Sequence, residues 1–590
     1  MEKLSDFKPL KRVSLPGIGN LTCAGLVVIV GPNSAGKSQF LKDIFHRLSG
    51  EPRTLVVADD IEVSKPEYEP FIRCLESEGY FETIYDENGK QQWRPRTTYL
   101  GTGQAIGQID LNQAKNLHNQ YSPTEKNNYR RSEYLNYFGR LLVTALFLDR
   151  RLTSLNQVGV IDFQEQPPQQ DLHALYLDDD ARSKLFNEML ESFGKAVWPD
   201  TSRGNLLCIR VSDEGVLPTA EDRLSPKKMS AYRTIESEGD GLKSYVATCV
   251  SLLLGRRPVC IVDEPEMCLH PPQAYNLGRF IGHYGSSPDT ATFVATHSSQ
   301  VLRGIIQTGQ NIQIVRLVRI EDKFIGHLVP AEILSDAIKK PTVRAESVLD
   351  GIFSQSVIVV EGDGDRLVYQ TTLETLSPEL RLDAHFAAVG GVGGIGDTCK
   401  LYRTLNIPIC VIADLDLIND PDRLKIILNE LTTNKNAASF SEEAKNIMTE
   451  IRKLPPNISP SELADELKTL LPVTRDWELE EDITVRKKLR KLANDLDRMR
   501  RLKRGGVSEF PDTIRDLLVS LIYNLKSHGL FLVPVGELEE WLKDEGINES
   551  KNNKWAWANT ASICIQEKGA KQGDIWDFMR EIGKYLCNGK

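Results

Sequence analysis

The residues with the clearest chemistry follow an apolar run near the N-terminus. Gly31, Gly36, Lys37 and Ser38 have the spacing G-x-x-x-x-G-K-S. In that pattern the glycines let backbone N–H groups surround phosphate oxygens, the lysine ammonium reaches the β and γ phosphates, and the serine hydroxyl binds Mg²⁺. We expect a helix over 37–48 whose positive end faces the anion. A chance glycine loop is the alternative, but a strand before it and an amphipathic helix after it favour nucleotide binding.

Two acidic residues with complementary chemistry follow a second apolar run, over 259–262. An aspartate in the position of Asp263 holds the Mg²⁺ of a phosphate-loop site, and the adjacent Glu264 polarises the attacking water. A further strand, expected over 292–296, ends at His297, which is placed to contact the γ-phosphate. A histidine packed in the core is the alternative. The order of these motifs is that of an ABC-type ATPase head.

A glycine-containing stretch, 237–241, precedes an apolar helix that we expect over 242–254. Small residues at a helix start present N–H groups to a phosphate. In ABC-type ATPases the signature segment does this across a dimer, onto the γ-phosphate of the partner. Ser237 and Gly239 are the candidate contacts, and a plain glycine-rich helix cap is the alternative.

The second half of the chain carries a separate group of acidic residues. The strand expected over 357–360 ends at Glu361, and the strand expected over 407–412 leads to Asp414 and Asp416. The carboxyl ends of parallel strands share one edge of a sheet, where α/β proteins build their sites. Asp414 and Asp416 would face the same side if the strand continued through them. Clustered carboxylates favour Mg²⁺ or Mn²⁺ over zinc, whereas a sheet with acidic loop ends is the structural alternative.

These motifs resemble a known family. The stretch DEPEMCLHP that starts at Asp263, with ATHSSQ around His297, is similar to the OLD (overcoming lysogenization defect) family and its relatives, a branch of SMC-like ABC ATPases. The Glu361 and Asp414 motifs, with the glycine-rich turn 390–394 between them, resemble a TOPRIM domain. An ABC head followed directly by TOPRIM is the OLD architecture. The resemblance extends to retron-associated and Gabija-like anti-phage effectors.

The resemblance implies a set of site residues and two cofactors, ATP and Mg²⁺ or Mn²⁺. The residues implied for ATP are Asn33, Ser34, Gly36, Lys37, Ser38, Ser237, Gly239, Asp263, Glu264 and His297. Mg²⁺ would lie at Ser38 and Asp263, with Glu264 as the hydrolytic base. The nuclease metal ligands implied are Glu361, Asp365, Asp414, Asp416 and Glu539, of which Glu361, Asp414 and Asp416 are catalytic. Glu539 ends a G-x-L-E element after a strand expected over 530–535, and Glu537 is the second choice.

The elements that must position these residues indicate an α/β fold. It is expected to be an ABC-type (SMC-like) P-loop ATPase head with a helical insertion, followed by a TOPRIM α/β domain with its own helical insertion. The expected ATPase segments are 1–60 and 231–340, around a mostly helical insertion at 61–230 for dimerisation or partner contact. That insertion includes helices near 130–148 and 181–195, and a short strand is expected before it, over 55–58. The expected TOPRIM segments are 350–420 and 529–590, around a helical insertion at 421–528.

The second insertion contains a basic segment, 486–504, with ten basic and two acidic side chains. The whole chain has a formal net charge of −10, so affinity for nucleic acid must come from a local patch. A solvated charged helix is an equally good interpretation. The residues predicted to contact DNA are Arg498, Arg500, Arg501, Lys503 and Arg504.

The composition is that of an ordinary globular protein, with 590 residues, 41% hydrophobic and 26% charged. Ten scattered cysteines form no C-x-x-C pair, which disfavours a zinc ribbon or a disulfide framework. The N-terminal residues lack the apolar core of a signal peptide, and no apolar run reaches the length of a membrane span. We therefore expect a cytoplasmic protein without a membrane partner.

Together these features predict an ATP-binding, ATP-regulated, divalent-metal-dependent DNA endonuclease of the OLD type, a phosphodiester hydrolase of bacterial anti-phage defence. The alternative is an ATP-gated DNA-binding or scaffold protein of the DNA-repair type with a non-cleaving TOPRIM domain. ABC heads complete their sites across a dimer, so we expect a homodimer or higher oligomer through the ATPase. The other partners implied are DNA and a regulatory partner, either a retron reverse transcriptase with its DNA or a helicase.

Overall fold

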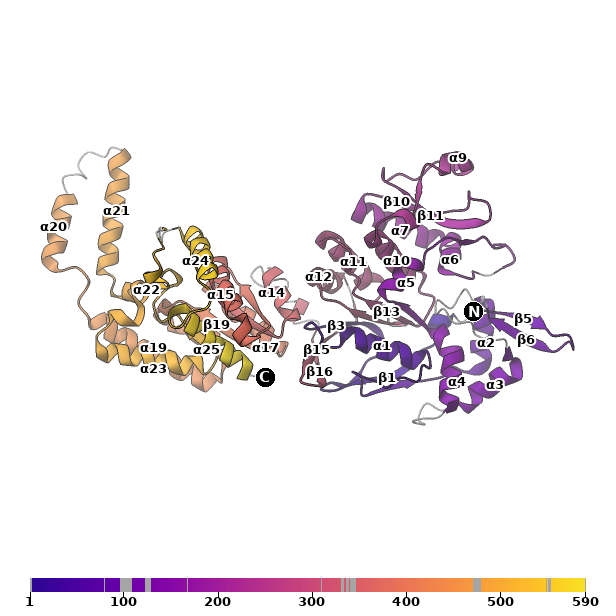
Figure 1. The fold of residues 1–590 in the computed structure, drawn as a ribbon, viewed down its shortest axis with the longest axis horizontal. Helices are drawn as coiled ribbons and strands as arrows, with labels where there is room; N and C mark the ends of the chain where they lie inside the picture. Colours follow the sequence, from indigo (N-terminus) through magenta and orange to yellow (C-terminus); the bar gives the residue numbers. More distant parts are fainter. Residues whose placement is uncertain are drawn as a thin grey trace. The chain divides into compact units, whose positions relative to one another are not determined.

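The protein is described by a computed structural model that divides into two compact units, Met1–Ile338 and Lys339–Lys590 (Figure 1). The structure describes residues 3–588 except 79, 96–108, 122–128, 167, 309, 331–333, 336–338, 340–345, 471–478, 548 and 550–552. Each unit has its own central sheet, so the two predicted centres of chemistry lie on separate scaffolds.

The central sheet of the first unit has six strands in the order β16-β15-β3-β14-β13-β8. Their bounds are β3 (Gly25–Val30), β8 (Val143–Leu146), β13 (Val259–Asp263), β14 (Ala291–Ala295), β15 (Ile312–Ile320) and β16 (Lys323–Val329). All pairs are parallel except the hairpin of β15 and β16. Every residue of β3 is buried, as expected for a parallel strand covered on both faces. The carboxyl ends of β3, β13 and β14 therefore share one edge.

Helices that follow these strands place the motif residues. α1 (Lys37–Leu48) follows β3, α10 (Asp240–Leu254) precedes β13, α11 (Pro271–Tyr284) follows it, and α12 (Ser299–Thr308) follows β14. The backbones of α11 and α12 are in close contact at Gly278. A Cβ at this position would lie 2.3 Å from the Val301 carbonyl oxygen. The helix starts at Lys37 and at Asp240 lie close to the predicted positions.

Among the described residues, the first unit also contains three smaller sheets. Their strands are β1 (Leu10–Leu15), β2 (Gly19–Leu21) and β4 (Asp60–Val63); β5 (Phe81–Tyr85), β6 (Gln91–Pro95) and β7 (Ile109–Asp110); and β9 (Val158–Gly159), β10 (Ala196–Asp200), β11 (Leu206–Ser212) and β12 (Arg233–Thr234). The other α-helices in the described part of this unit are α2 (Tyr68–Ser77), α3 (Leu111–Gln120), α4 (Tyr129–Phe138), α5 (Leu148–Thr153), α6 (Asp171–Leu177), α7 (Asp179–Phe193), α8 (Ala220–Arg223) and α9 (Pro226–Met229).

The segment 61–230 differs from the mostly helical insertion that we expected. Its described residues include strands of four sheets, and β8 within it pairs in parallel with β13 of the central sheet. The helix expected over 130–148 ends at Phe138 in the structure, and β8 follows after a short 3₁₀ turn. Residues 141–146 are apolar apart from one threonine, and an apolar run this short is also typical of a buried strand. Pairing with β13 determines that this run forms a strand rather than the end of a helix.

The strand expected over 55–58 does not form either. The backbone N–H groups of Val56, Val57 and Ala58 donate to one carboxylate oxygen of Asp43, at 3.0, 2.7 and 3.1 Å. These donors are therefore not available to a neighbouring strand. Asp43 is buried on α1, so it fixes this segment beside the helix that follows the phosphate loop.

The second unit contains a four-stranded parallel sheet in the order β18-β17-β19-β20. Its strands are β17 (Ser356–Val360), β18 (Ala384–Ala388), β19 (Ile409–Ala413) and β20 (Leu530–Leu532). The helices around it are α14 (Glu346–Asp350), α15 (Asp363–Thr375), α16 (Ser377–Leu380), α17 (Ile395–Thr404), α24 (Lys554–Lys568) and α25 (Asp574–Asn588). Trp541, Trp557 and Trp576 fill its core beside β17 and β20.

The chain between β19 and β20 is helical in its described part. Its α-helices are α18 (Pro421–Leu431), α19 (Asn434–Lys453), α20 (Pro460–Leu470), α21 (Leu479–Leu496), α22 (Arg501–Arg504) and α23 (Asp512–Lys526). α20 and α21 extend away from the sheet of this unit (Figure 1) and share a small apolar cluster of Leu470, Val485 and Leu492. This helical insertion thus separates β20 from β19 in the sequence, although the two strands are neighbours in the sheet.

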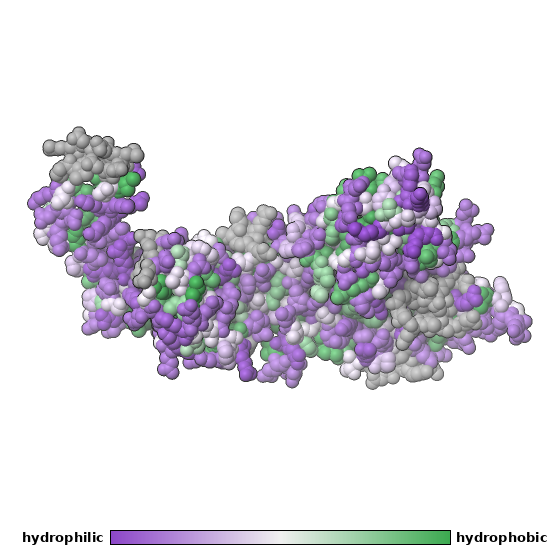
Figure 2. Space-filling view, turned by 45° about the horizontal axis from the view of Figure 1, so that its top comes forward, coloured by the Kyte–Doolittle hydropathy of each residue, from purple (hydrophilic) through white to green (hydrophobic). Residues whose placement is uncertain are grey.

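The surface has the polar character that the composition predicts. The face in Figure 2 is mainly hydrophilic, with hydrophobic residues in scattered groups. Within the described part of the chain, each helix is too short or too polar to cross a membrane.

Candidate functional site

The phosphate loop lies between β3 and α1 and depends on glycine at two positions. Gly31 has φ +140°, and a Cβ there would lie 2.1 Å from the Leu317 carbonyl oxygen. Gly36 has φ +89°, and a Cβ there would lie 2.7 Å from the Phe324 ring. Both the left-handed backbone and the close packing therefore exclude a side chain. Asn33 and Ser34 are exposed between these glycines.

Lys37 and Ser38 begin α1 and face the acidic residues of β13. The buried Lys37 ammonium donates to the carbonyl oxygens of Gly31 and Pro32, both at 2.7 Å. Burial lowers the pKa of Lys37 to about 8, although the nearby charges of Glu264, Glu266 and Asp263 oppose the shift. The Ser38 hydroxyl donates to Asp263 Oδ1 at 2.9 Å. The two residues predicted to share Mg²⁺ are thus in contact.

Glu264 and His297 meet at the ends of β13 and β14. His297 Nε2 lies 3.2 Å from Glu264 Oε1, and burial together with the Lys37 charge lowers the pKa of His297. Glu264 has a left-handed backbone with φ +48°, which turns its side chain out of the strand path. Glu266 accepts hydrogen bonds from the Thr296 hydroxyl at 2.9 Å and from the His297 N–H at 2.6 Å. Glu264 and His297, both predicted for the ATP site, are therefore in contact.

Arg151 supports this turn and was not identified from the sequence. It is 1% exposed and donates to the carbonyl oxygens of Leu146 (2.9 Å), Asp263 and Glu264 (2.9 Å). Its Nε donates to the Ser244 hydroxyl of α10 at 2.8 Å. One side chain thus joins β8, the end of β13 and α10. The apolar run before it is the signal that could have indicated a buried strand shortly before Arg151, which lies in α5.

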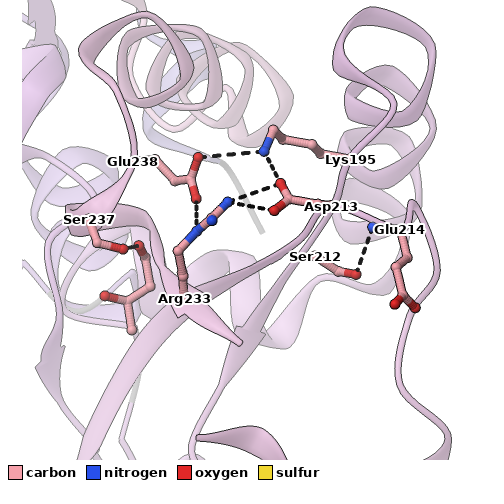
Figure 3. Close-up of polar contacts among 8 residues, drawn as sticks. Lys195, Ser212, Asp213, Glu214, Arg233, Ser237 and Glu238 are labelled. Carbon is pink, nitrogen blue, oxygen red and sulfur yellow. Dashed lines mark hydrogen bonds and ion pairs between the residues drawn. The ribbon is translucent and has the colours of Figure 1, made fainter. Parts of the chain in front are cut away.

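Charged side chains brace the stretch that resembles a signature. Glu238 pairs with Arg233 at 2.7 Å and with Lys195 at 3.7 Å (Figure 3). Asp213 pairs with the same two cations, at 2.8 Å for Arg233. The Glu238 side chain is 9% exposed. Its negative charge is therefore balanced within this small network.

Ser237 and Gly239 lie beside this network at the start of α10. Gly239 is the N-cap of α10, and both residues are exposed. The Ser237 hydroxyl donates to the Thr234 carbonyl oxygen at 2.7 Å (Figure 3). The helix start therefore faces solvent, and its role toward a phosphate stays a prediction.

In the second unit, acidic side chains gather at the carboxyl edge of the parallel sheet. We call Glu361, Asp365, Asp414, Asp416 and Glu539 the acidic cluster. Glu361 follows β17 and accepts a hydrogen bond from the Asp414 N–H, after β19, at 3.4 Å. Asp365 lies in the first turn of α15, where its carboxylate accepts the Gly362 N–H at 2.9 Å. Glu539 comes from a 3₁₀ turn after β20 and is 2% exposed.

The pKa shifts show that these carboxylates are close enough to repel one another. Burial, and then the charges of Glu361, Asp365 and Asp416, raise the pKa of Asp414 well above its ordinary value. Burial and the Asp365 charge raise the pKa of Glu361. Burial raises the pKa of Asp365 to about 6, with a contribution from Glu539. The cluster therefore concentrates negative charge where a cation would be stabilised.

The strand expected to carry Asp414 and Asp416 does not continue through them. β19 ends at Ala413, and Leu415–Asn419 forms a 3₁₀ helix. The Leu415 N–H donates to the Gly536 carbonyl oxygen at 2.9 Å, which fastens this turn to the loop after β20. Asp414 and Asp416 share the cluster because of this turn, so the argument from strand alternation was wrong.

Two lysines lie among the carboxylates. Lys503 Nζ is 2.9 Å from Asp416 Oδ2, and Lys554 Nζ is 3.4 Å from Glu539 Oε1. Burial lowers the pKa of Lys554, but Glu539, Asp414 and Glu537 raise it to a value above the ordinary one. Lys554 was not identified from the sequence, where nothing separates it from a surface lysine. Burial and the Glu539 charge also raise the pKa of Glu537, while the charges of Lys554 and Lys503 oppose the shift.

The acidic cluster fits a divalent cation in its chemistry, although its side chains are spread. Among the residues that the structure describes, no three His, Cys, Asp or Glu side chains converge to hold a metal ion. However, both carboxylate oxygens of the buried Glu539 lack a hydrogen-bond partner within the described chain. Carboxylate oxygens are the ligands that Mg²⁺ and Mn²⁺ prefer.

The basic segment is organised differently from one continuous DNA-binding helix. α21 ends at Leu496, and the Asp497 side chain caps a 3₁₀ turn by accepting the Met499 N–H at 3.0 Å. Arg498 donates to the Leu454 carbonyl oxygen, and Arg501 donates to Asn457 at 2.7 Å.

Three of the residues predicted to contact DNA thus have partners inside the unit, because Lys503 pairs with Asp416. Arg504 is exposed and Arg500 is half-buried. The structure therefore reduces the surface on which a DNA contact was predicted, and the contact itself stays a prediction.

Comparisons with known proteins identify both kinds of domain. Residues 352–416 match a family model described as "Overcoming lysogenization defect protein-like, TOPRIM domain". Residues 211–303 match one described as "AAA domain, putative AbiEii toxin, Type IV TA system". The chain is also similar to Endonuclease GajA of Bacillus cereus (strain VD045), with 24% identity over 192 residues, which is 31% of each chain. The chain thus aligns with about a third of the length of this curated relative.

Solved structures similar to this chain include two SMC head domains. The SmcHead bound to the C-winged helix domain of ScpA has a TM-score of 0.31 and 12% identity, and covers 56% of this chain and 100% of that one. The SMC head domain from Thermotoga maritima has a TM-score of 0.27 and 12% identity, and covers 55% of this chain and 100% of that one. The predicted α/β fold class, an ATPase head followed by a TOPRIM domain, is confirmed by the matched domains and the two sheets.

Proposed function

We propose that this protein is an ATP-regulated, divalent-metal-dependent DNA endonuclease. The observation that carries the proposal is the meeting of Glu361, Asp414 and Asp416 at the carboxyl edge of one parallel sheet. The match to an OLD-like TOPRIM domain spans these residues and Asp365. The similarity to a protein named as an endonuclease supports the same activity.

In this proposal the acidic cluster holds Mg²⁺ or Mn²⁺ beside a DNA phosphate. A bound divalent cation supplies charge stabilisation for the attacking and leaving oxygens of the phosphodiester. Glu361 and Asp414 provide oxygens from the two central strand ends, and Glu539 provides buried oxygens without a hydrogen bond from the third segment. The Lys554 ammonium beside Glu539 adds positive charge that opposes repulsion between the carboxylates and the DNA.

The first unit would bind and hydrolyse ATP to regulate that cleavage. Lys37 and Ser38 would contact phosphate and Mg²⁺, and Asp263 would share the Mg²⁺ with Ser38. Glu264 would polarise the attacking water, and His297, 3.2 Å from Glu264, would contact the γ-phosphate. Ser237 and Gly239 would complete the site of a second copy, so we propose a homodimer or higher oligomer. The names of the two matched families, which mention a lysogenization defect and a toxin, support a role in anti-phage defence.

A plasmid assay tests the nuclease proposal. We expect the full-length protein to cleave plasmid DNA with Mg²⁺ or Mn²⁺ and to be inactive in EDTA. ATP should change the rate by about fivefold or more, the scale of an ordinary coupling free energy. An intact plasmid in both metals, with and without ATP, would contradict the proposal.

The second candidate function is an ATP-gated DNA-binding or scaffold protein with a non-cleaving TOPRIM domain. One observation favours it, because Lys503 and Lys554 already neutralise part of the acidic cluster. A protein of that kind would retard DNA in a mobility-shift assay without cutting it in any metal. The plasmid assay therefore separates the two functions directly.

The pKa of Lys37 predicts how ATP affinity depends on pH. Because burial lowers this pKa to about 8, the ammonium is charged at pH 7 and is lost as the pH rises through 8. We expect ATP to bind about tenfold more weakly at pH 9 than at pH 7, since phosphate favours the protonated amine. Calorimetric titration across this range gives the profile.

A Lys37→Arg variant is the control, because its guanidinium does not titrate in this range. Its profile should be flat between pH 7 and pH 9, whatever its affinity. A wild-type profile that is equally flat would show that charge loss at Lys37 does not govern binding.

A further inference from the structure

Lys503 was predicted to lie on a DNA-binding surface, but its ammonium lies in the acidic cluster. Its Nζ is 2.9 Å from Asp416 Oδ2, with side-chain exposures of 41% and 26%. Burial opposes the charged form, but the hydrogen bond to Asp416 and the charges of Asp414 and Glu537 raise the pKa of Lys503. Three carboxylates thus act on one ammonium that comes from the helical insertion.

The backbone that carries Lys503 is built into the same edge of the sheet. A Cβ on Gly536 would lie 2.3 Å from the Lys503 carbonyl oxygen, and a Cβ on Gly506 would lie 2.0 Å from the Pro534 carbonyl oxygen. Both glycines have positive φ, +114° and +60°. The Val507 N–H also donates to the Pro534 carbonyl oxygen at 2.9 Å. The short helix α22 is therefore held against the loop after β20.

That loop is also bonded to the turn that carries Asp416, through the Leu415 N–H and the Gly536 carbonyl oxygen. Three segments far apart in sequence thus meet at Gly536. By contrast, Arg504, the next residue in sequence, is exposed. The position of Lys503 therefore follows from close backbone packing rather than from a flexible surface side chain.

An ammonium and a divalent cation bound to the same carboxylate repel each other, so each weakens the binding of the other. Asp416 is held by Lys503, and the described residues show no three converging ligands. We propose that Lys503 is a positioning residue of the acidic cluster, which holds Asp416 and competes with a divalent cation for this carboxylate. The proposal rests on the proposed function only in taking the cluster as the cation site.

Mn²⁺ binding to the metal-free, nucleotide-free full-length protein tests this competition. We expect Lys503→Gln to bind Mn²⁺ about tenfold more tightly than wild type in a calorimetric titration, because the competing charge is gone. Lys503→Arg keeps the charge and should bind Mn²⁺ like wild type. Lys491→Gln removes an equal charge from the exposed face of α21 and should also bind like wild type.

A second readout uses the wild-type protein and so does not depend on folding of the variant. The rate at which a reagent acetylates Lys503, followed by mass spectrometry, should rise when Mn²⁺ is added. Rates at Lys491 should stay unchanged.

The outcomes separate the competition from the nuclease proposal. Unchanged or weaker Mn²⁺ binding by Lys503→Gln would overturn the competition, while plasmid cleavage by wild type would still support the nuclease. If the variant is not folded, the acetylation of wild-type protein decides. A Lys503 acetylation rate that does not change when Mn²⁺ is added would also overturn the competition. Absence of both Mn²⁺ binding and cleavage in wild type and variant alike would overturn both proposals.

Discussion

Replacing Asp414 with asparagine is expected to reduce metal-dependent plasmid cleavage about a thousandfold, the scale seen when one charge-stabilising group is removed from an active site. Asp414 lies between Glu361 and Asp416 at the end of β19, and burial with these neighbouring charges raises its pKa. An amide keeps the shape of the side chain but removes the charge that would hold the cation. Initial rates in Mg²⁺ and in Mn²⁺ measure the effect.

The same substitution is expected to leave the protein as stable as wild type, or more stable. A carboxyl group whose folded pKa is raised destabilises the folded state at every pH above its unfolded value. At pH 8 the neutral amide removes that repulsion, so thermal denaturation should show no loss of stability. Inactivity with intact stability separates a role at the site from damage to the fold.

Asp363→Asn is the matched control for this experiment. Asp363 lies between Glu361 and Asp365 in sequence, but its side chain is 67% exposed and pairs with Arg366 at 3.2 Å. It should retain wild-type cleavage. Cleavage by Asp414→Asn at more than about a tenth of the wild-type rate would contradict the assignment of the acidic cluster.

Replacing Arg151 with methionine is expected to destabilise the first unit by about 3–5 kcal/mol. The substitution leaves the buried Leu146 carbonyl oxygen and the partly buried carbonyl oxygens of Asp263 and Glu264 without this donor. It also removes the hydrogen bond that Arg151 donates to the Glu264 carbonyl oxygen, in the left-handed turn. ATP binding should weaken with it, because Asp263 and Glu264 lose their fixed backbone.

Hydrogen exchange of the full-length variant measures this loss unit by unit. Peptides from β13 and α10 should exchange faster, whereas peptides from β17 and β19 in the second unit should not change. Lys184→Met, at an exposed position of α7 with 41% side-chain exposure, should leave both sets unchanged. Equal exchange of β13 in Arg151→Met and wild type would show that the turn stands without Arg151.

Much of this protein follows from local sequence. The phosphate loop, the helix start at Lys37 and the buried strands before Glu361 and Asp414 were predicted close to their observed positions. Each depends on neighbouring residues, because glycine conformation, helix capping and a short apolar run act within a few positions. The expectation that carboxylates gather at one sheet edge also follows, since parallel strands align their carboxyl ends.

Tertiary structure alone decided the features that depend on distant segments. β8 became a strand because it pairs with β13, more than a hundred residues later in the chain. Arg151 holds the turn after β13 because three carbonyl oxygens lie around its guanidinium. Lys503 lies in the acidic cluster because Gly506 and Gly536 allow two backbone segments to pack in contact. A sequence shows the charge of an arginine or a lysine, but which group meets that charge is set by packing between remote residues.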